Sequence, residues 1–157
     1  MTPAVRYAGF WRRLAAAIVD SMVLMAVVTP LMLLFYGPVA LQRSHGYLGL
    51  FDLFLNQVLP IVATVYFWTR FGATPGKRLL ECEVADATRF DRIGVKQALL
   101  RYLGYLASLL PLGLGFLWIG WDPRKQGFHD KIAHTVVLYR PEDESTKSLQ
   151  QLMEEAR

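Results

Sequence analysis

Asp20 is the residue of this sequence with the clearest chemical consequence. It is the one charged side chain in the apolar stretch Leu14–Tyr36. An ionised aspartate at the centre of a membrane helix costs about 2.5–3.5 kcal/mol on insertion scales. Such residues therefore face protein or a water-filled cavity and pair with another group. We expect Asp20 to be buried from lipid, where it either carries protons or cations or holds helices together by hydrogen bonds.

Several polar residues are candidate partners for Asp20. Arg13 lies seven residues earlier on the same helical face, about 10 Å away along the axis, too far for a direct salt bridge. Arg101 opens a later apolar stretch and is either an interfacial anchor or the counter-charge to Asp20. Asn56 lies four residues after Asp52 on one helical face and is expected to hydrogen-bond between helices. The fourth candidate is the loop that contains His129 and Asp130.

The run 122–131 is dense in polar side chains and contains Asp122, His129 and Asp130. Histidine titrates near neutral pH, so His129 and Asp130 either handle a proton together or pair locally within a loop. His129 and His134 are five residues apart, which differs from the i, i+4 zinc pair. We therefore expect no metal and no other cofactor.

Two other function classes are disfavoured by the pattern. The stretch Gly72–Arg78 resembles a phosphate loop, but three residues instead of four separate its glycines, and Arg78 replaces the Ser or Thr. No nucleophile and base occur in a recognisable set, so we expect no enzyme. The basic residues flank apolar stretches, which argues against nucleic acid as a partner.

Three apolar blocks must position these residues: Leu14–Tyr36, Leu48–Trp68 and Tyr102–Trp121. A membrane span needs about 20 predominantly apolar residues. The blocks predict an all-α membrane protein and exclude a soluble enzyme or a disordered chain. The single cysteine, Cys82, excludes a disulfide scaffold. The first block is too long for a cleaved signal peptide and carries an acid in its middle.

The distribution of basic residues predicts the topology. Arg6, Arg12 and Arg13 precede the first block, whereas the loop Gly37–Tyr47 holds one basic residue, and the segment Arg70–Arg101 holds seven. Basic residues favour the cytoplasmic side of a membrane. We expect a multi-pass protein of the cell inner membrane, with a cytoplasmic N-terminus and an external loop Gly37–Tyr47.

The third block contains a helix-breaking segment, Pro111–Gly115, which reads PLGLG. It allows a kinked span, a re-entrant hairpin or two short tilted helices. The stretches Leu80–Ala85 and Thr135–Tyr139 have strand-like patterns and are not stable unpaired. Their pairing places both on one membrane side, which predicts a small cytoplasmic two-stranded element and a cytoplasmic C-terminus.

The last residues, 141–157, form a polar tail. Ser148 can cap a short amphipathic helix, with Gln151 at the capping-box position. This helix either lies solvated at the interface or binds a partner. The predicted membrane domain therefore covers residues 8–140.

Three motifs together resemble the RDD family of membrane proteins, named for one arginine and two aspartates. Phe10–Asp20 reads FWRRLAAAIVD, Gly72–Leu80 reads GATPGKRLL, and Trp121–Ala133 reads WDPRKQGFHDKIA. The resemblance covers roughly residues 8–140. It implies that the family arginine is Arg13, with Arg12 the alternative.

The resemblance also implies that the first family aspartate is Asp20. It implies that the second is Asp130, with Asp122 the competitor. His134 stands where many relatives have glycine.

The resemblance implies a transport role, such as sodium–proton exchange or small-solute movement, through an intramembrane aspartate. Three blocks are few for a solute path, so such a transporter would need a homo-oligomer. The alternative is a non-transporting assembly, scaffold or sensor module. The lipid bilayer is the expected partner, and the sequence names no substrate.

Overall fold

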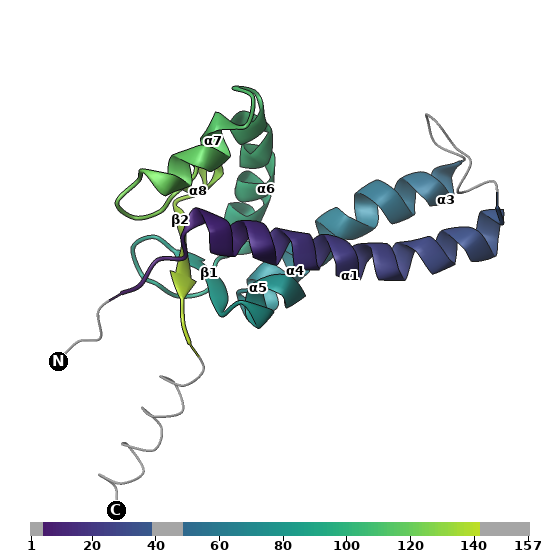
Figure 1. Cartoon of the computed structure of the whole chain (residues 1–157), viewed down its shortest axis with the longest axis horizontal. Coiled ribbons are helices and arrows are strands. Elements are labelled where there is room, and N and C mark those ends of the chain that lie inside the picture. The colour runs from purple at the N-terminus through teal and green to yellow at the C-terminus, as the bar shows by residue number, and fades with distance from the viewer. Residues whose placement is uncertain (1–4, 39–48, 142–157) are drawn as a thin grey trace, which may run out of the picture.

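The computed structural model describes residues 5–38 and 49–141 and is mostly helical. Two helical rods are long and apolar enough to cross a membrane (Figure 1). The first is α1 (Phe10–Tyr36). The second runs continuously through α3 (Leu50–Leu53), η1 (Phe54–Val58) and α4 (Leu59–Phe71). The first two apolar blocks thus correspond to two candidate spans.

The two rods lie side by side and pack through apolar residues, which centre on Val28, Met32 and Leu55. The segment η1 is a π-helical turn within the second rod. Pro60 lies two residues after it and has no backbone N–H, so the regular i→i−4 hydrogen-bond pattern cannot continue there. Asn56 lies in this wider turn and faces α1, where its Nδ2 lies 3.8 Å from the Met32 sulfur.

A short helix, α5 (Pro75–Leu79), packs against α1. The contact depends on Gly76, because a Cβ at this position would lie 2.3 Å from the carbonyl oxygen of Ala16. Glycine therefore allows the two backbones to approach closely. This approach places the central loop beside Asp20.

The predicted strands pair. β1 (Cys82–Asp86) and β2 (Thr135–Tyr139) are antiparallel, with Cys82 opposite Tyr139 and Asp86 opposite Thr135. The chain before α1 adds to the free edge of β2, since the Ala8 N–H donates to the Val137 carbonyl at 2.8 Å. The segment that leads into α1 and both strands therefore meet at one end of the rods (Figure 1).

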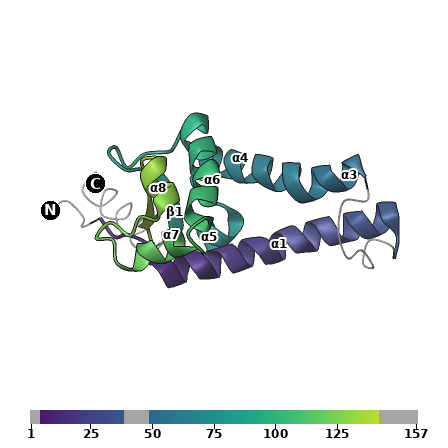
Figure 2. The same cartoon turned by 90° about the horizontal axis from the view of Figure 1, so that it is seen from above.

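The third apolar block is not one straight helix. It contains α6 (Val95–Leu109), α7 (Leu114–Leu117) and the 3₁₀ turn η2 (Trp118–Gly120), with a bend of 113° between the two parts. The predicted break is present, with φ values of 53° at Leu112 and 81° at Gly113. The structure therefore has two candidate spans and one bent pair, and it does not confirm the third block as a further span. Figure 2 shows α6 running crosswise to α1.

The last helix, α8 (Phe128–Ile132), packs on α6. The contact is close at Gly104, where a Cβ would lie 2.8 Å from the His129 Cα. His134 follows α8 with a φ of 52°, the left-handed region that favours glycine. The chain then turns directly into β2.

Two expectations fall outside the described residues. One is the loop Gly37–Tyr47 beyond residue 38, and the other is the tail helix that would begin at Ser148. Both stay predictions.

Candidate functional site

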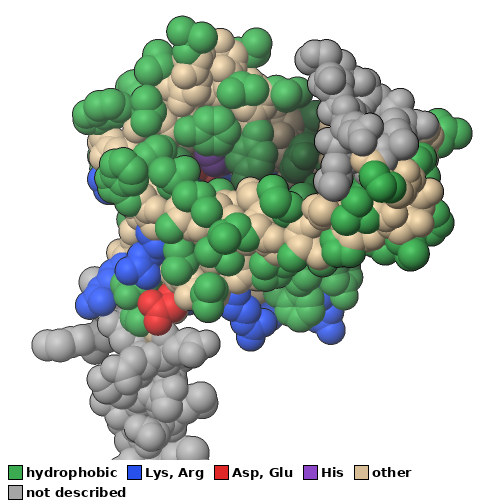
Figure 3. All heavy atoms as spheres, turned by 45° about the vertical axis from the view of Figure 1, so that its right-hand side comes forward, with side chains coloured by type: hydrophobic (Ala, Val, Ile, Leu, Met, Phe, Trp, Pro, Cys, Tyr) green, Lys and Arg blue, Asp and Glu red, His purple; other side chains and the backbone are tan. Residues whose placement is uncertain are grey.

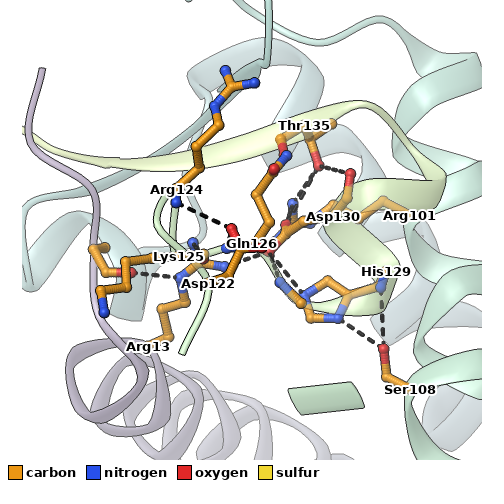
Figure 4. Close-up of polar contacts among 12 residues, drawn as sticks. Arg13, Arg101, Ser108, Asp122, Arg124, Lys125, Gln126, His129, Asp130 and Thr135 are labelled. Atoms are coloured by element: carbon orange, nitrogen blue, oxygen red, sulfur yellow. Dashed lines mark hydrogen bonds and ion pairs between the residues drawn. The ribbon is translucent and has the colours of Figure 1, made fainter. Parts of the chain in front are cut away.

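Asp130 is the centre of the largest buried polar group among the described residues, and its side chain is fully buried (Figure 4). Its Oδ2 lies 2.5 Å from the Arg13 Nη1, and its Oδ1 accepts a hydrogen bond from the Arg101 Nη1. The Gly127 N–H donates to Oδ2 at 3.0 Å. The Thr135 hydroxyl lies 3.4 Å from Oδ1. Both carboxylate oxygens are thus occupied by donors of the chain.

The two arginines connect the Asp130 carboxylate to four elements. Arg13 comes from the first turn of α1 and also donates to the Ala8 carbonyl at 2.9 Å and to the Lys125 carbonyl at 2.5 Å. Arg101 comes from the middle of α6 and donates to the Thr135 hydroxyl at 2.7 Å. The group therefore joins α1, α6, α8 and the beginning of β2.

The arginines determine the charge state of Asp130. Burial alone would raise its pKa, but the Arg101 and Arg13 guanidinium groups more than offset burial and hold the pKa well below its ordinary value. Asp130 is therefore an ionised carboxylate in the folded protein. A group of this kind does not release and take up protons near neutral pH.

His129 lies beside this ion pair in an apolar setting. Its ring contacts the rings of Tyr105 and Phe116, with centroid distances of 4.7 and 5.2 Å. The His129 N–H donates to the Ser108 Oγ at 3.1 Å, and this oxygen lies 3.0 Å from the ring Nδ1. The Ser108 hydroxyl is thus oriented to donate to Nδ1, which assigns the ring proton to Nε2, 3.5 Å from Asp130.

Burial lowers the pKa of His129 to about 3. The nearby Asp130 carboxylate opposes this shift, while the Arg101 and Arg13 charges add to it. His129 is therefore neutral at physiological pH. The expected proton-handling pair, His129 and Asp130, is present as a neighbouring pair whose two members both keep one protonation state.

Asp20 belongs to a separate group. Its Oδ2 accepts a hydrogen bond from the Thr74 hydroxyl at 2.5 Å, and its Oδ1 accepts one from the Gly76 N–H at 2.7 Å. The Lys77 Nζ lies 4.0 Å from Oδ2. The expected interaction with a polar and basic group is present, but all four named candidates were wrong. Arg13, Arg101 and the 129–130 loop pair with each other, and Asn56 pairs elsewhere.

The reason is that helical spacing defines a face but not a partner. The backbone of α5 approaches α1 at Gly76 and thereby presents its N–H and the Thr74 hydroxyl to Asp20. Arg101, proposed as a counter-charge to Asp20, is directed to Asp130 by the packing of α8 on α6.

The remaining predicted residues form two local groups. Asp122 lies 2.5 Å from the Lys131 Nζ and accepts the backbone N–H groups of Arg124 at 3.1 Å and Gln126 at 3.2 Å. Burial raises the pKa of Asp122, but these donors outweigh it, and its pKa is lowered. Asn56 donates to the Asp52 carboxylate at 2.6 Å within the second rod. Asp52 is fully buried.

Several contributing residues were not anticipated. Thr74 and Lys77 lie in the stretch Gly72–Arg78, which resembles an imperfect phosphate loop. This resemblance was a sequence signal that could have identified them. Ser108 and Thr135 are single hydroxyl residues in apolar surroundings, and no sequence spacing distinguishes them. In residues 5–38 and 49–141, no three His, Cys, Asp or Glu side chains gather as metal ligands would.

The sequence model of the RDD family matches residues 7–134. The chain belongs to the RDD family. It is 33% identical over 107 residues to the uncharacterized protein RP437 of Rickettsia prowazekii, a match that covers 66% of this chain and 59% of that protein. It is 25% identical over 150 residues to the uncharacterized protein YxaI of Bacillus subtilis, covering 85% and 97% of the two chains. No solved structure matches the chain.

In this RDD-family chain, the three residues that the resemblance assigns do not form one site. Arg13 pairs with Asp130, and Asp20 pairs with the central motif. Asp122, the competitor for the second aspartate, caps a turn of its own with Lys131.

We predict that Asp130→Asn strongly destabilises the protein. The change leaves two buried guanidinium groups without a counter-charge, and breaking a buried pair in this way costs about 3–5 kcal/mol. The thermal unfolding midpoint in detergent measures the loss. Asp91→Asn is the control, because Asp91 is exposed. A midpoint for Asp130→Asn close to that of the control would contradict the role assigned to the ion pair.

We also predict a histidine-dependent loss of stability in mild acid. The unfolded state binds a proton at His129 below pH of about 6.5, whereas the folded state does so only near pH 3. Stability therefore falls by about 1.4 kcal/mol per pH unit as pH decreases through this window. Unfolding measured from pH 7 to pH 5 should show a shallower slope for His129→Gln. The exposed His134 provides the control, and His134→Gln should keep the slope of the unaltered protein.

Proposed function

We propose that this RDD-family chain is a non-transporting membrane module in which two spanning helices hold a rigid polar assembly at one membrane face. The observation that carries this proposal is that the carboxylates of Asp20 and Asp130 are both held by donors of the chain. Each carboxylate oxygen already accepts a donor from the chain. A carrier that moves sodium or protons through an aspartate needs carboxylate oxygens that its cargo can reach.

The proposed module is cytoplasmic at the strand end and is inserted in a bacterial inner membrane. Basic residues cluster before α6 and after η2, which favours the cytoplasmic side at both places. The two named relatives come from bacteria.

The bent pair is best explained as a re-entrant hairpin. At 1.5 Å per residue, α6 is about 22 Å long, and α7 with η2 is about 10 Å long, whereas the hydrocarbon core is about 30 Å thick. Because β1 precedes the pair and β2 follows it, their pairing requires the chain to leave and return on one membrane side. The tip is apolar, with Leu112 96% exposed, as expected for a hairpin that ends within lipid.

We predict that both ends of the hairpin are cytoplasmic. In a chain whose Cys82 is replaced by alanine, Arg89→Cys and Arg140→Cys should react with an impermeant thiol reagent only after cells are permeabilised. Ser44→Cys, in the loop between the two spans, should react in intact cells. Reaction of Arg140→Cys in intact cells would show that the third block crosses the membrane completely.

A second candidate is a small ion or solute carrier that works as a homo-oligomer. It is favoured by a recess in the apolar surface, at the floor of which a histidine and charged side chains are visible (Figure 3). A path for solute would then run along the recess and between protomers.

Flux measurements in liposomes separate the two candidates. For the module, we predict no sodium or proton movement above that of empty liposomes. Asp20→Asn should lower the thermal unfolding midpoint, since it weakens charge-assisted hydrogen bonds that contribute about 1.5–3 kcal/mol. Asp91→Asn again serves as the control. A pH-dependent flux that Asp20→Asn abolishes would support the carrier and overturn the module.

A further inference from the structure

The helix α6 is arranged in the opposite way to a surface helix of a soluble protein. Its inward face carries polar side chains, since Arg101 and Ser108 are buried against the beginning of β2 and against α8. In a soluble protein, the apolar face of a helix is the one that faces the core. The outward face of α6 instead carries five exposed apolar side chains, here called the α6 stripe: Val95, Leu99, Leu103, Leu106 and Leu110.

The α6 stripe is one continuous surface. Its members follow each other at intervals of four, four, three and four residues, which places them on one side of the helix. Leu103 and Leu106 are each 61% exposed, and Leu110 is 84% exposed. Contiguous exposed apolar surfaces mark contacts with a membrane or with another protein. The stripe therefore predicts an apolar partner outside the chain.

The direction of α6 determines how the stripe can meet a membrane. The helix runs crosswise to α1, the longer of the two candidate spans (Figure 2). Figures 1 and 2 both place α8 on one flank of α6, while the long part of the rods extends away from the other flank. Figure 3 turns that side forward and shows hydrophobic side chains over much of it. If α1 crosses the membrane, the stripe runs along the membrane plane and not through it.

The segment that leads into α6 indicates a lipid surface as the partner. Lys96 lies three residues before Leu99 and therefore borders the stripe. Basic side chains beside an apolar face are typical of helices that lie in an anionic membrane interface. Segment 88–96 holds one exposed acid and three exposed basic side chains, Arg89, Arg92 and Lys96.

The other end of the bent pair carries two exposed tryptophans. Trp121 is 76% exposed, and Trp118 is 45% exposed. Tryptophan is enriched where a protein passes the headgroups of a membrane. Both ends of the bent pair therefore carry side chains that suit the headgroup region, whereas the bend between them exposes Leu110 and Leu112.

We propose that α6 lies in the plane of the membrane within the cytoplasmic leaflet, where acyl chains cover the α6 stripe and anionic headgroups contact Arg89, Arg92 and Lys96. The hairpin of the proposed function then enters the membrane at a shallow angle and stays in one leaflet. This inference rests on the proposed function, which supplies a membrane-spanning α1 and cytoplasmic ends of the hairpin. A second copy of the chain is the other possible cover for the stripe, and the test separates it from lipid.

The test measures the depth of the stripe in the membrane. The full chain with Cys82→Ala receives one further change, Leu99→Cys, Leu103→Cys, Leu106→Cys or Leu110→Cys, and each cysteine is spin-labelled in liposomes of phosphatidylglycerol and phosphatidylcholine. Collision with oxygen, which concentrates in lipid, and with a neutral nickel chelate, which stays in water, gives the depth of each label. We expect all four labels to lie in lipid, at depths that agree within one helical turn, about 5 Å.

Labels on α1 are the matched control. Leu14 and Met22 are exposed and eight residues apart, so their depths in a crossing helix differ by about 12 Å. A steep α6 would give a difference of about 16 Å between Leu99 and Leu110. No gradient on α1 would overturn the proposed function together with this inference, whereas steep gradients on both helices would overturn the inference alone.

The lipid composition tests the basic end of α6. In liposomes of phosphatidylcholine alone, we expect the label at Leu99 to become shallower, while the label at Leu110 keeps its depth. Arg92→Gln combined with Lys96→Gln should make the Leu99 label shallow in both kinds of liposome. Arg78→Gln is the control, because Arg78 is an exposed basic residue of α5, and this change should leave the lipid dependence intact.

Two further results would overturn the proposal. Labels protected from both oxygen and the nickel chelate would show that a second copy or another protein covers the stripe. A Leu99 label at the same depth in both kinds of liposome would show that the basic residues do not contact anionic headgroups.

Discussion

The salt bridges of Asp130 to Arg13 and Arg101 are the interaction on which the rest of the structure depends. A carboxylate and two guanidinium groups are removed from water together, and each charge is tolerated only while the others are in place. Because the three side chains come from α8, α1 and α6, this requirement fixes how the helices meet. The short helix α8 is held against α6 by the close approach at Gly104, and β2 follows directly.

The Asp20 carboxylate is also stabilised by partners from the chain, but mainly by hydrogen bonds instead of two arginines. Its hydrogen bonds come from the Thr74 hydroxyl and the Gly76 N–H, and a lysine stands nearby. The helix α1 is therefore attached twice to the elements at its end, once through Arg13 and once through Asp20. The two attachments use different loops, which explains why the family motifs are far apart in the sequence yet meet along α1.

The sequence predicted the parts of the fold that depend on local pattern. The apolar stretches 14–36 and 48–68 were strong signals, the segment PLGLG marked the break in the third block, and alternating residues identified the two strands. The partner of Asp20 was not predictable, because it depends on how closely α5 approaches α1. The bend between α6 and α7 and the burial of Asp52 also depend on tertiary packing. The roles of Ser108 and Thr135 could not be predicted, since a single hydroxyl residue is not part of a repeating sequence pattern.

The separation of these partners along the chain has a consequence for biosynthesis. Asp20 is made 54 residues before Thr74, and Arg13 is made 117 residues before Asp130. At ordinary elongation rates, Arg13 waits on the order of ten seconds for its carboxylate. During that interval α1 carries an arginine and an aspartate without the partners that the folded domain provides. These charges must therefore be solvated from outside the domain until its C-terminal elements emerge.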